Sequence, residues 1–343
     1  MLVVSLALAG TFSANGQVVR KQVVENGGPG PYKAEIVEDS TSARFTFYRP
    51  ADMAAAVSSE GRKLPVVLYA NGGCRNDNVQ MRLLLNNLAS QGYVIGAIGP
   101  YNETDVSEHW KERLAFNFPT GKKVVLANGD EVLPMSDAER KKMQDQIAKE
   151  MAAARNAGAN RNAAPARPAT YPRMLLEMLD WLTDRNADPK SEYYHMLDLE
   201  KVAVMGQSCG GAQAMAVSHD PRVKTTIMLN SGMGDANMQG VGKAQLENLH
   251  APILYLVGGE IDMATENAEK DFVRIKSVPV AFVSTFDGHS GTFYERNGGE
   301  YANVVCRWLD WQFKDRIAGA GYFLDDRIGQ MTNPGWTIMN KNF

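Results

Sequence analysis

The sequence predicts an α/β protein in which a mostly parallel central sheet is flanked by helices. Short apolar runs alternate with helix-like segments along the chain, which is typical of this class. One run, residues 202–205, leads directly into Gly-Gln-Ser-Cys-Gly and then into small, helix-compatible residues. Polar residues also follow other apolar runs, as expected where the carboxyl ends of parallel strands line one edge of a sheet.

The expected strands are short apolar runs rich in valine, isoleucine and leucine. The first of them is expected to be an early antiparallel strand, and the later ones belong to the alternating pattern. In chain order the expected strands are residues 44–49, 64–70, 93–98, 202–205, 223–229, 252–257 and 280–285.

The expected helices lie between these strands and carry apolar residues at helical spacing. Residues 81–91 follow the second strand, residues 171–185 form an amphipathic segment, and a small-residue helix follows the serine motif. Residues 302–314 form the closing helix. Its spacing is marked by Val305, Trp308, Leu309 and Gln312.

Ser208 lies at the centre of the Gly-x-Ser-x-Gly motif, between an expected strand and an expected helix. This context is typical of a nucleophile elbow, in which a strained backbone exposes the serine hydroxyl. Gly206 and Gly210 remove side chains that would collide at so sharp a turn. The alternative is an ordinary tight turn with a solvated serine, but the flanking strand and helix favour a catalytic nucleophile.

A catalytic serine needs a base, and His289 is the best candidate among five histidines. It follows the strand at 280–285, and Asp287 and Gly288 turn the chain just before it, so its side chain can face a cleft. The other four histidines are expected to be ordinary surface or capping residues: His109, His195, His219 and His250.

Asp262 is the expected acid that orients the base. It follows the strand at 252–257, in the sequence Gly-Gly-Glu-Ile-Asp. Glu260 is the nearest competitor, and Asp287 is a weaker one because it is only two residues from His289. Asp262 could instead be a helix N-cap, since a helix-like segment follows it. The chain order of serine, acid and histidine is that of α/β-hydrolases.

An oxyanion hole requires backbone N–H groups directed at the negative oxygen that develops during acyl transfer. One donor is expected to be the amide of Cys209, directly after the nucleophile. The second is expected from Gly73, with Cys74 as the alternative, because Asn71-Gly72-Gly73 follows the strand at 64–70 and glycines let backbone approach a ligand. A glycine turn without a ligand role is the competing interpretation.

The chain resembles the α/β-hydrolase superfamily over about residues 44–314. Within it, the chain is similar to the esterase branch of dienelactone hydrolase, platelet-activating-factor acetylhydrolase, chlorophyllase and cutinase-type polyesterases. Residues 71–73 match the oxyanion motif, with asparagine where histidine is commoner. Residues 206–211 match the Gly-His-Ser-x-Gly-Gly elbow with glutamine in place of histidine. Residues 259–262 and 288–289 match the acid and base motifs, so the resemblance implies an α/β-hydrolase fold and a Ser208, Asp262, His289 triad.

Length and composition agree with one catalytic domain over residues 17–343. The chain has 343 residues, 44% of them hydrophobic, and a net charge of −3, so nothing points to a nucleic-acid partner. No second apolar stretch is long enough to span a bilayer. Residues 1–16 resemble a signal peptide, which would make the protein exported, whether periplasmic or secreted. Because the basic residues that usually precede the apolar core of a signal peptide are missing, a hydrophobic N-terminal strand is the alternative.

The sequence predicts a helical insertion over or beside the cleft at about residues 102–169. Ser136 and Glu139 form a capping box, and an alanine-, asparagine- and proline-rich return covers 152–168. This insertion is either a cap that shapes the substrate pocket or a peripheral helix. One helical face is expected to carry Met143, Ile147, Met151 and Ala154.

Two of the three cysteines, Cys74 and Cys209, lie in the two loops expected to contribute amides to one oxyanion. A disulfide between them is therefore geometrically plausible in an oxidising compartment, and two buried thiols are the alternative. Cys306 falls in the closing helix and has no obvious partner.

Together these residues predict a serine esterase that cleaves carboxylic esters through an acyl-enzyme. No cofactor is expected, and no histidine or cysteine spacing suggests a metal. The substrate is expected to be a small-molecule or polymer ester, such as acyl groups of plant polysaccharide or a polyester. A lipase or acylhydrolase of small lipids and a non-catalytic binding protein of the same fold are the alternatives.

Overall fold

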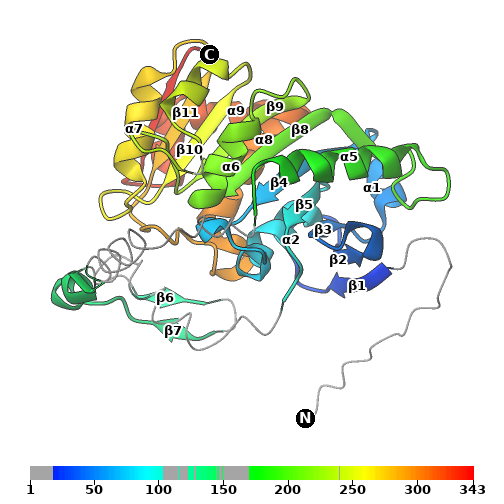
Figure 1. Cartoon of the computed structure of the whole chain (residues 1–343), viewed down its shortest axis with the longest axis horizontal. Helices are drawn as coiled ribbons and strands as arrows, with labels where there is room; N and C mark the ends of the chain where they lie inside the picture. The colour runs from blue at the N-terminus through cyan, green and yellow to red at the C-terminus, as the bar shows by residue number, and fades with distance from the viewer. Residues whose placement is uncertain are drawn as a thin grey trace, which may run out of the picture.

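The computed structural model describes residues 18–102, 115, 123–126, 129–143, 145, 146, 149, 170–238 and 240–343. Its centre is a large twisted sheet covered by helices (Figure 1). The expected signal peptide at 1–16, His109 and the return at 152–168 lie outside the described residues. No helix in the described part of the chain is both long and apolar enough to cross a membrane.

Ten strands form the central sheet in the described ranges, in the order β1-β2-β3-β5-β4-β8-β9-β10-β11-β12. In this order the six consecutive strands β5, β4, β8, β9, β10 and β11 are parallel to one another, and antiparallel strands flank them on both sides. The expectation of a mostly parallel sheet is therefore confirmed. The strands are β1 Val18–Val24, β2 Ala34–Asp39, β3 Phe45–Pro50, β4 Leu64–Ala70, β5 Val94–Ile98, β8 Leu197–Gln207, β9 Val223–Leu229, β10 Ile253–Val257, β11 Val280–Ser284 and β12 Thr337–Lys341.

The elbow strand β8 is longer than the expected run at 202–205. Its first half contains Asp198 and Glu200, and only the stretch from Val202 is apolar and fully buried. A register shift between Pro65 and Val66 of β4 separates the two halves. Charged residues alternate with leucines in the first half, which is why a continuous apolar run locates only the second half.

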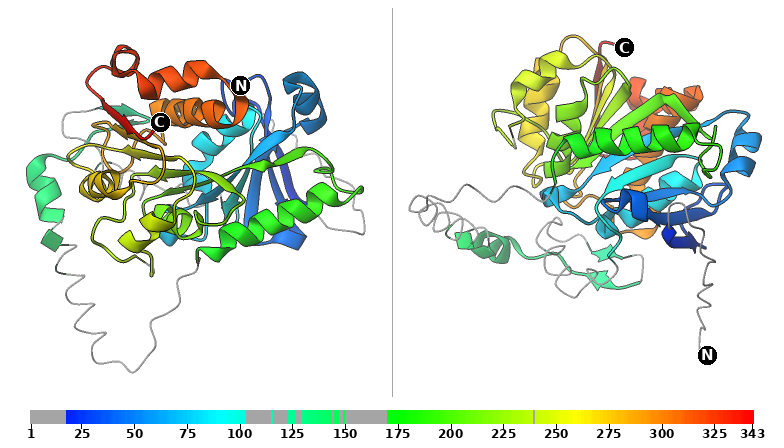
Figure 2. Two further views of the ribbon diagram at one scale, coloured as in Figure 1. Left: turned by 90° about the horizontal axis from the view of Figure 1, so that it is seen from above. Right: turned by 45° about the vertical axis from the view of Figure 1, so that its right-hand side comes forward.

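Helices cover both faces of the sheet (Figure 2), and each strand supplies both layers because successive side chains alternate in direction. In β4, Val67 and Tyr69 pack with α2 and α8, whereas Val66 and Leu68 pack with α5. Helices α6 and α7 pack with β9 to β11 in a third cluster. The helices are α1 Met53–Glu60, α2 Arg82–Ser90, α5 Arg173–Ala187, α6 Cys209–Val217, α7 Thr265–Arg274, α8 Gly299–Lys314, α9 Ile317–Leu324 and α10 Asp326–Thr332.

The insertion is not purely helical, which corrects the sequence-based expectation. It contains an antiparallel hairpin of β6 (Val124–Val125) and β7 (Glu131–Val132), set apart from the central sheet in Figure 1. Gly129, before β7, has φ 89°, a conformation that glycine adopts without strain. The hairpin packs on Tyr294 through Val124 and Val132.

The capping box of the insertion is present at the start of a helix over residues 137–143. The N–H of Ser136 donates to Glu139 Oε2 at 2.9 Å, and the N–H of Glu139 donates to Ser136 Oγ at 3.3 Å. Met143 belongs to this helix. Three positions of the expected apolar face lie outside the described residues: Ile147, Met151 and Ala154.

Candidate active site

Ser208 occupies the sharp turn between β8 and α6. Its backbone has φ 52° and ψ −119°, a conformation that a residue with a side chain rarely adopts. A Cβ atom on Gly206 would lie 2.1 Å from the carbonyl oxygen of Gly210, and one on Gly210 would lie 2.1 Å from the carbonyl oxygen of Ala70. Only glycine fits at either position, so both glycines of the motif permit the turn.

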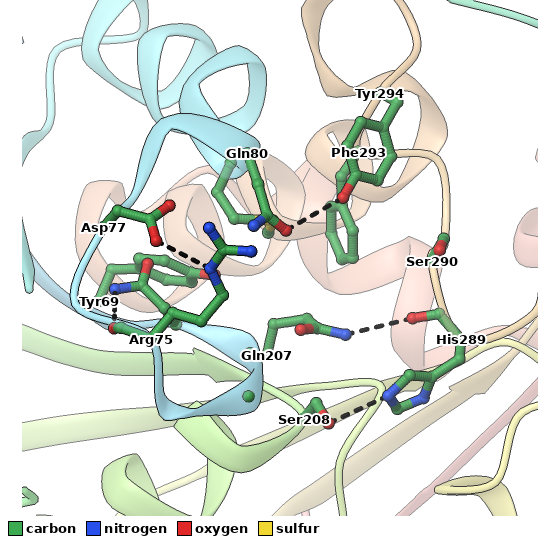
Figure 3. A pocket seen from close by; sticks show the side chains of 14 residues that line it. Tyr69, Arg75, Asp77, Gln80, Gln207, Ser208, His289, Ser290, Phe293 and Tyr294 are labelled. Atoms are coloured by element: carbon green, nitrogen blue, oxygen red, sulfur yellow. Dashed lines mark hydrogen bonds and ion pairs between the residues drawn. The ribbon is translucent and has the colours of Figure 1, made fainter. Parts of the chain in front are cut away.

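The structure brings the predicted serine, base and acid together in a continuous chain of hydrogen bonds. His289 Nε2 lies 3.0 Å from Ser208 Oγ, and His289 Nδ1 lies 2.6 Å from Asp262 Oδ1 (Figure 3 shows the contact with Ser208). All three residues follow the carboxyl ends of parallel strands, namely β8, β10 and β11. The parallel sheet therefore assembles the site from segments that are far apart in the sequence.

Four donors surround the carboxylate of Asp262, whose side chain is fully buried. Besides His289, these are the N–H groups of Gly258 (2.8 Å) and Ala264 (2.9 Å) and the amide of Asn230 (2.8 Å). Burial raises the pKa of Asp262, but the hydrogen bonds from His289, Ala264 and Asn230 outweigh it and hold the pKa below its usual value. Asp262 is therefore ionised at neutral pH.

Asp262 is not the N-cap of the following helix, because α7 begins at Thr265 and Ala264 occupies the capping position. Glu260, the nearest competitor for the acid, is exposed. The carboxylate bonded to His289 is that of Asp262 and not that of Asp287. The three other described histidines are exposed surface residues, as expected: His195, His219 and His250.

The expected oxyanion loop lies beside the elbow. Gly73 has φ 62°, and the N–H of Cys74 donates to the carbonyl oxygen of Asn71 at 3.2 Å. The Asn71 side chain donates to the carbonyl oxygens of Ile98 (2.7 Å) and Arg75 (3.1 Å), which holds the loop to the end of β5.

A disulfide joins this loop to the elbow. It links Cys74 to Cys209, the residue after Ser208, with 5.3 Å between the two Cα atoms. The loop carrying one expected oxyanion donor is thus covalently tied to the residue that carries the other.

A cleft of about 210 Å³ opens above Ser208 and His289. Figure 3 shows Ser208 and His289 at one end of it and Tyr69, Arg75 and Asp77 grouped at the other. Phe293 and Tyr294 form an aromatic side, so the cleft lies beside the hairpin of the insertion that packs on Tyr294. The lining residues are Tyr69, Asn71, Gly72, Gly73, Arg75, Asp77, Gln80, Met81, Gln207, Ser208, His289, Ser290, Phe293 and Tyr294.

A family model described as platelet-activating factor acetylhydrolase, isoform II, matches residues 40–277. The chain belongs to this family. Membership indicates a hydrolase that acts on esters, with an α/β-hydrolase-like fold in agreement with the sheet described above. The matched span contains Ser208 and Asp262 and ends before His289. In a search of curated proteins, no match was found.

In this member of the acetylhydrolase family, Gln207 directly precedes Ser208 and lines the cleft. Its amide donates to the carbonyl oxygen of His289 at 3.2 Å, so it ties the elbow to the loop of the base. A Cβ atom on Gly72 would lie 1.9 Å from Gln207 Oε1, so Gly72 must be glycine for this side chain to fit.

Sequence analysis missed Asn230, which follows β9 and connects two loops of the site. Its side chain donates to Asp262 Oδ2 at 2.8 Å and to the carbonyl oxygen of Gly288 at 3.0 Å. The signal was present, because Asn230 and Ser231 are polar residues at the carboxyl end of a parallel strand. Ser231 Oγ donates to the carbonyl oxygen of Ser208 at 2.8 Å and supports the elbow.

Proposed function

We propose that the protein hydrolyses carboxylic esters through an acyl-enzyme formed on Ser208. The observation that carries this proposal is the hydrogen-bonded order Asp262, His289, Ser208 at the floor of an open cleft. A serine hydroxyl is a weak nucleophile unless a neighbouring base accepts its proton, and this order supplies an oriented base.

In the first half-reaction, His289 Nε2 accepts the hydroxyl proton of Ser208 while Oγ bonds to the ester carbonyl carbon. Asp262 keeps the imidazole in the tautomer that leaves Nε2 free to accept, and stabilises its charged form. When the tetrahedral intermediate collapses, the bond to the alcohol oxygen breaks and that oxygen takes the proton from His289. In the second half-reaction, water bonds to the acyl carbon while His289 accepts its proton. The bond to Ser208 Oγ then breaks, Oγ takes the proton from His289, and the carboxylic acid product is released.

The amides of Gly73 and Cys209 are the proposed oxyanion donors. Cys209 is the first residue of α6 and directly follows Ser208, so its N–H lies at the positive end of the helix dipole. The N–H of Cys74 already donates to the carbonyl of Asn71, which favours Gly73 over Cys74 as the second donor. The disulfide holds the two donor loops at a fixed separation, which such preorganised stabilisation requires.

Removing the disulfide with the double variant Cys74→Ala and Cys209→Ala should lower both stability and activity. Its 135-residue separation in sequence predicts a loss of about 2–5 kcal/mol in unfolding free energy. We expect kcat/KM to fall about tenfold, less than the loss of a whole oxyanion donor. Urea unfolding and ester kinetics measure both, with Cys306→Ala as the control because Cys306 is a free cysteine. Equal stability and activity in the double variant would contradict a bracing role.

The proposed substrates are short acyl esters, because a cleft of about 210 Å³ is small for an esterase pocket. We propose acyl groups of plant polysaccharide or a polyester, with the protein exported after removal of residues 1–16. The family description favours a second candidate, the acyl group of a small lipid.

A fluorophosphonate probe tests the serine mechanism directly. We expect stoichiometric labelling of the folded protein, mapped by peptide mass spectrometry to Ser208. A panel of p-nitrophenyl esters of increasing chain length, with acetylated xylan, feruloylated sugars and a short-chain phospholipid, then ranks the substrates, and short acyl chains should be hydrolysed fastest. Absence of labelling in folded protein would favour a non-catalytic binding protein.

A further inference from the structure

Three buried polar atoms that have no hydrogen-bond partner in the described structure belong to residues lining the active-site cleft. They are Tyr69 Oη, Asn71 Oδ1 and Asp77 Oδ1. Buried polar atoms normally have a partner, because burial without one costs free energy. Three such atoms around one cleft indicate that a bound ligand supplies a polar group that forms hydrogen bonds with them.

Tyr69 is a hydrogen-bond donor within this group. It is the penultimate residue of β4, its side chain is fully buried, and yet it lines the cleft. Burial, together with the neighbouring Tyr294 and the carboxylate of Asp77, raises the pKa of Tyr69 well above its usual value. Its hydroxyl therefore stays protonated and requires an acceptor.

Asp77 supplies the complementary acceptor. Arg75 Nε donates to its Oδ2 at 2.8 Å, which fixes the orientation of the carboxylate and leaves Oδ1 buried without a donor. Figure 3 shows Tyr69 and Asp77 on the same side of Arg75, at the end of the cleft opposite His289. A donor and an acceptor thus line the same end of the cleft.

We propose that Tyr69 and Asp77 form a subsite for a neutral hydroxyl group of the substrate. A hydroxyl can accept from Tyr69 and donate to Asp77 at once, whereas a methyl group can do neither and an ionised carboxylate has no proton to donate to Asp77 Oδ1. The inference rests on the proposed esterase function and narrows its substrate class to esters of hydroxylated compounds. The hydroxyl can belong either to the alcohol, as in a sugar or polyol, or to the acyl group, as in a hydroxy acid.

Two series of esters test the subsite and distinguish these sources. The first compares monoacetates of straight-chain diols of two to five carbons with acetates of alcohols in which methyl replaces the free hydroxyl. The second makes the same replacement in the acyl group of ethyl esters. In both series a further ester carries a carboxylate in place of the hydroxyl. We expect kcat/KM to favour the hydroxylated ester over its methyl and carboxylate analogues about tenfold or more in one series.

In the variant Tyr69→Phe, the ratio of kcat/KM for the hydroxylated ester to that for its methyl analogue should fall toward one. Thermal unfolding of the variant checks that its fold is intact. Tyr193→Phe is the matched control, because Tyr193 also has a buried hydroxyl without a partner but does not line the cleft. A preference near one in both wild-type series, or one unchanged by Tyr69→Phe, would overturn the inference and leave the esterase proposal intact. Absence of hydrolysis of every ester, together with absence of phosphonate labelling, would overturn both.

Discussion

Replacing Ser208 with alanine should abolish ester hydrolysis almost completely, with kcat falling by about 10⁶, the loss that follows removal of the nucleophile from a serine protease. The variant loses the atom that bonds to the carbonyl carbon, and the remaining Asp262–His289 pair has nothing to activate except water. Its fold should persist, since alanine fills less space than serine at the elbow and the backbone contacts there involve glycines. Initial rates with p-nitrophenyl acetate, corrected for the rate in buffer, measure the loss.

Ser218→Ala is the matched control for this experiment. Ser218 is a buried serine at the other end of α6, and its hydroxyl donates to the carbonyl oxygen of Met215. We expect near-normal kinetics from this control and no labelling by fluorophosphonate in Ser208→Ala. Residual activity of more than about a hundredth of wild type in Ser208→Ala would show that another group performs the reaction.

The three residues of the proposed triad could be predicted because local rules identify each one separately. Ser208 has a motif, while His289 and Asp262 each follow a buried strand and a turn that contains glycine. Parallel strands then bring these separate positions to one edge of the sheet, so no long-range information is needed beyond the strand pattern. The proximity of Cys74 and Cys209 follows from the same reasoning, because β4 and β8 are neighbours.

Other parts of the structure depend on contacts that no local pattern encodes. The edge strand β1 is largely exposed, and Arg-Lys-Gln interrupts its valines, so it lacks the continuous apolar run that marks a buried strand. The hydrogen bonds of Asn230 to Asp262 and Gly288 depend on how two later loops close over β9. Tyr69 is indistinguishable by sequence from an ordinary core tyrosine, and only its unpartnered hydroxyl in the cleft reveals a different role.

The variant Asp262→Asn should lower kcat by about 10⁴ without altering the position of Ser208, as found for the corresponding change in a serine protease. The amide can present an N–H to His289 Nδ1 in place of an accepting oxygen, which favours the tautomer whose Nε2 carries the proton. That imidazole cannot accept the proton of Ser208. Glu260→Gln, at the exposed competitor position, is the matched control and should leave kcat near the wild-type value. A larger loss of kcat in Glu260→Gln than in Asp262→Asn would show that Glu260, and not Asp262, is the acid that orients His289.

The same variant should change how stability depends on pH. Because the folded-state pKa of Asp262 lies below its unfolded value, the ionised carboxylate contributes stability at pH above about 4, and this contribution disappears as the pH falls through the folded-state pKa. The difference in unfolding free energy between wild type and Asp262→Asn should therefore be constant near neutrality and shrink below about pH 4. Urea unfolding at a series of pH values measures it. A difference that grows on acidification would mean that Asp262 is protonated in the folded protein, and its proposed role in stabilising charged His289 would then be wrong.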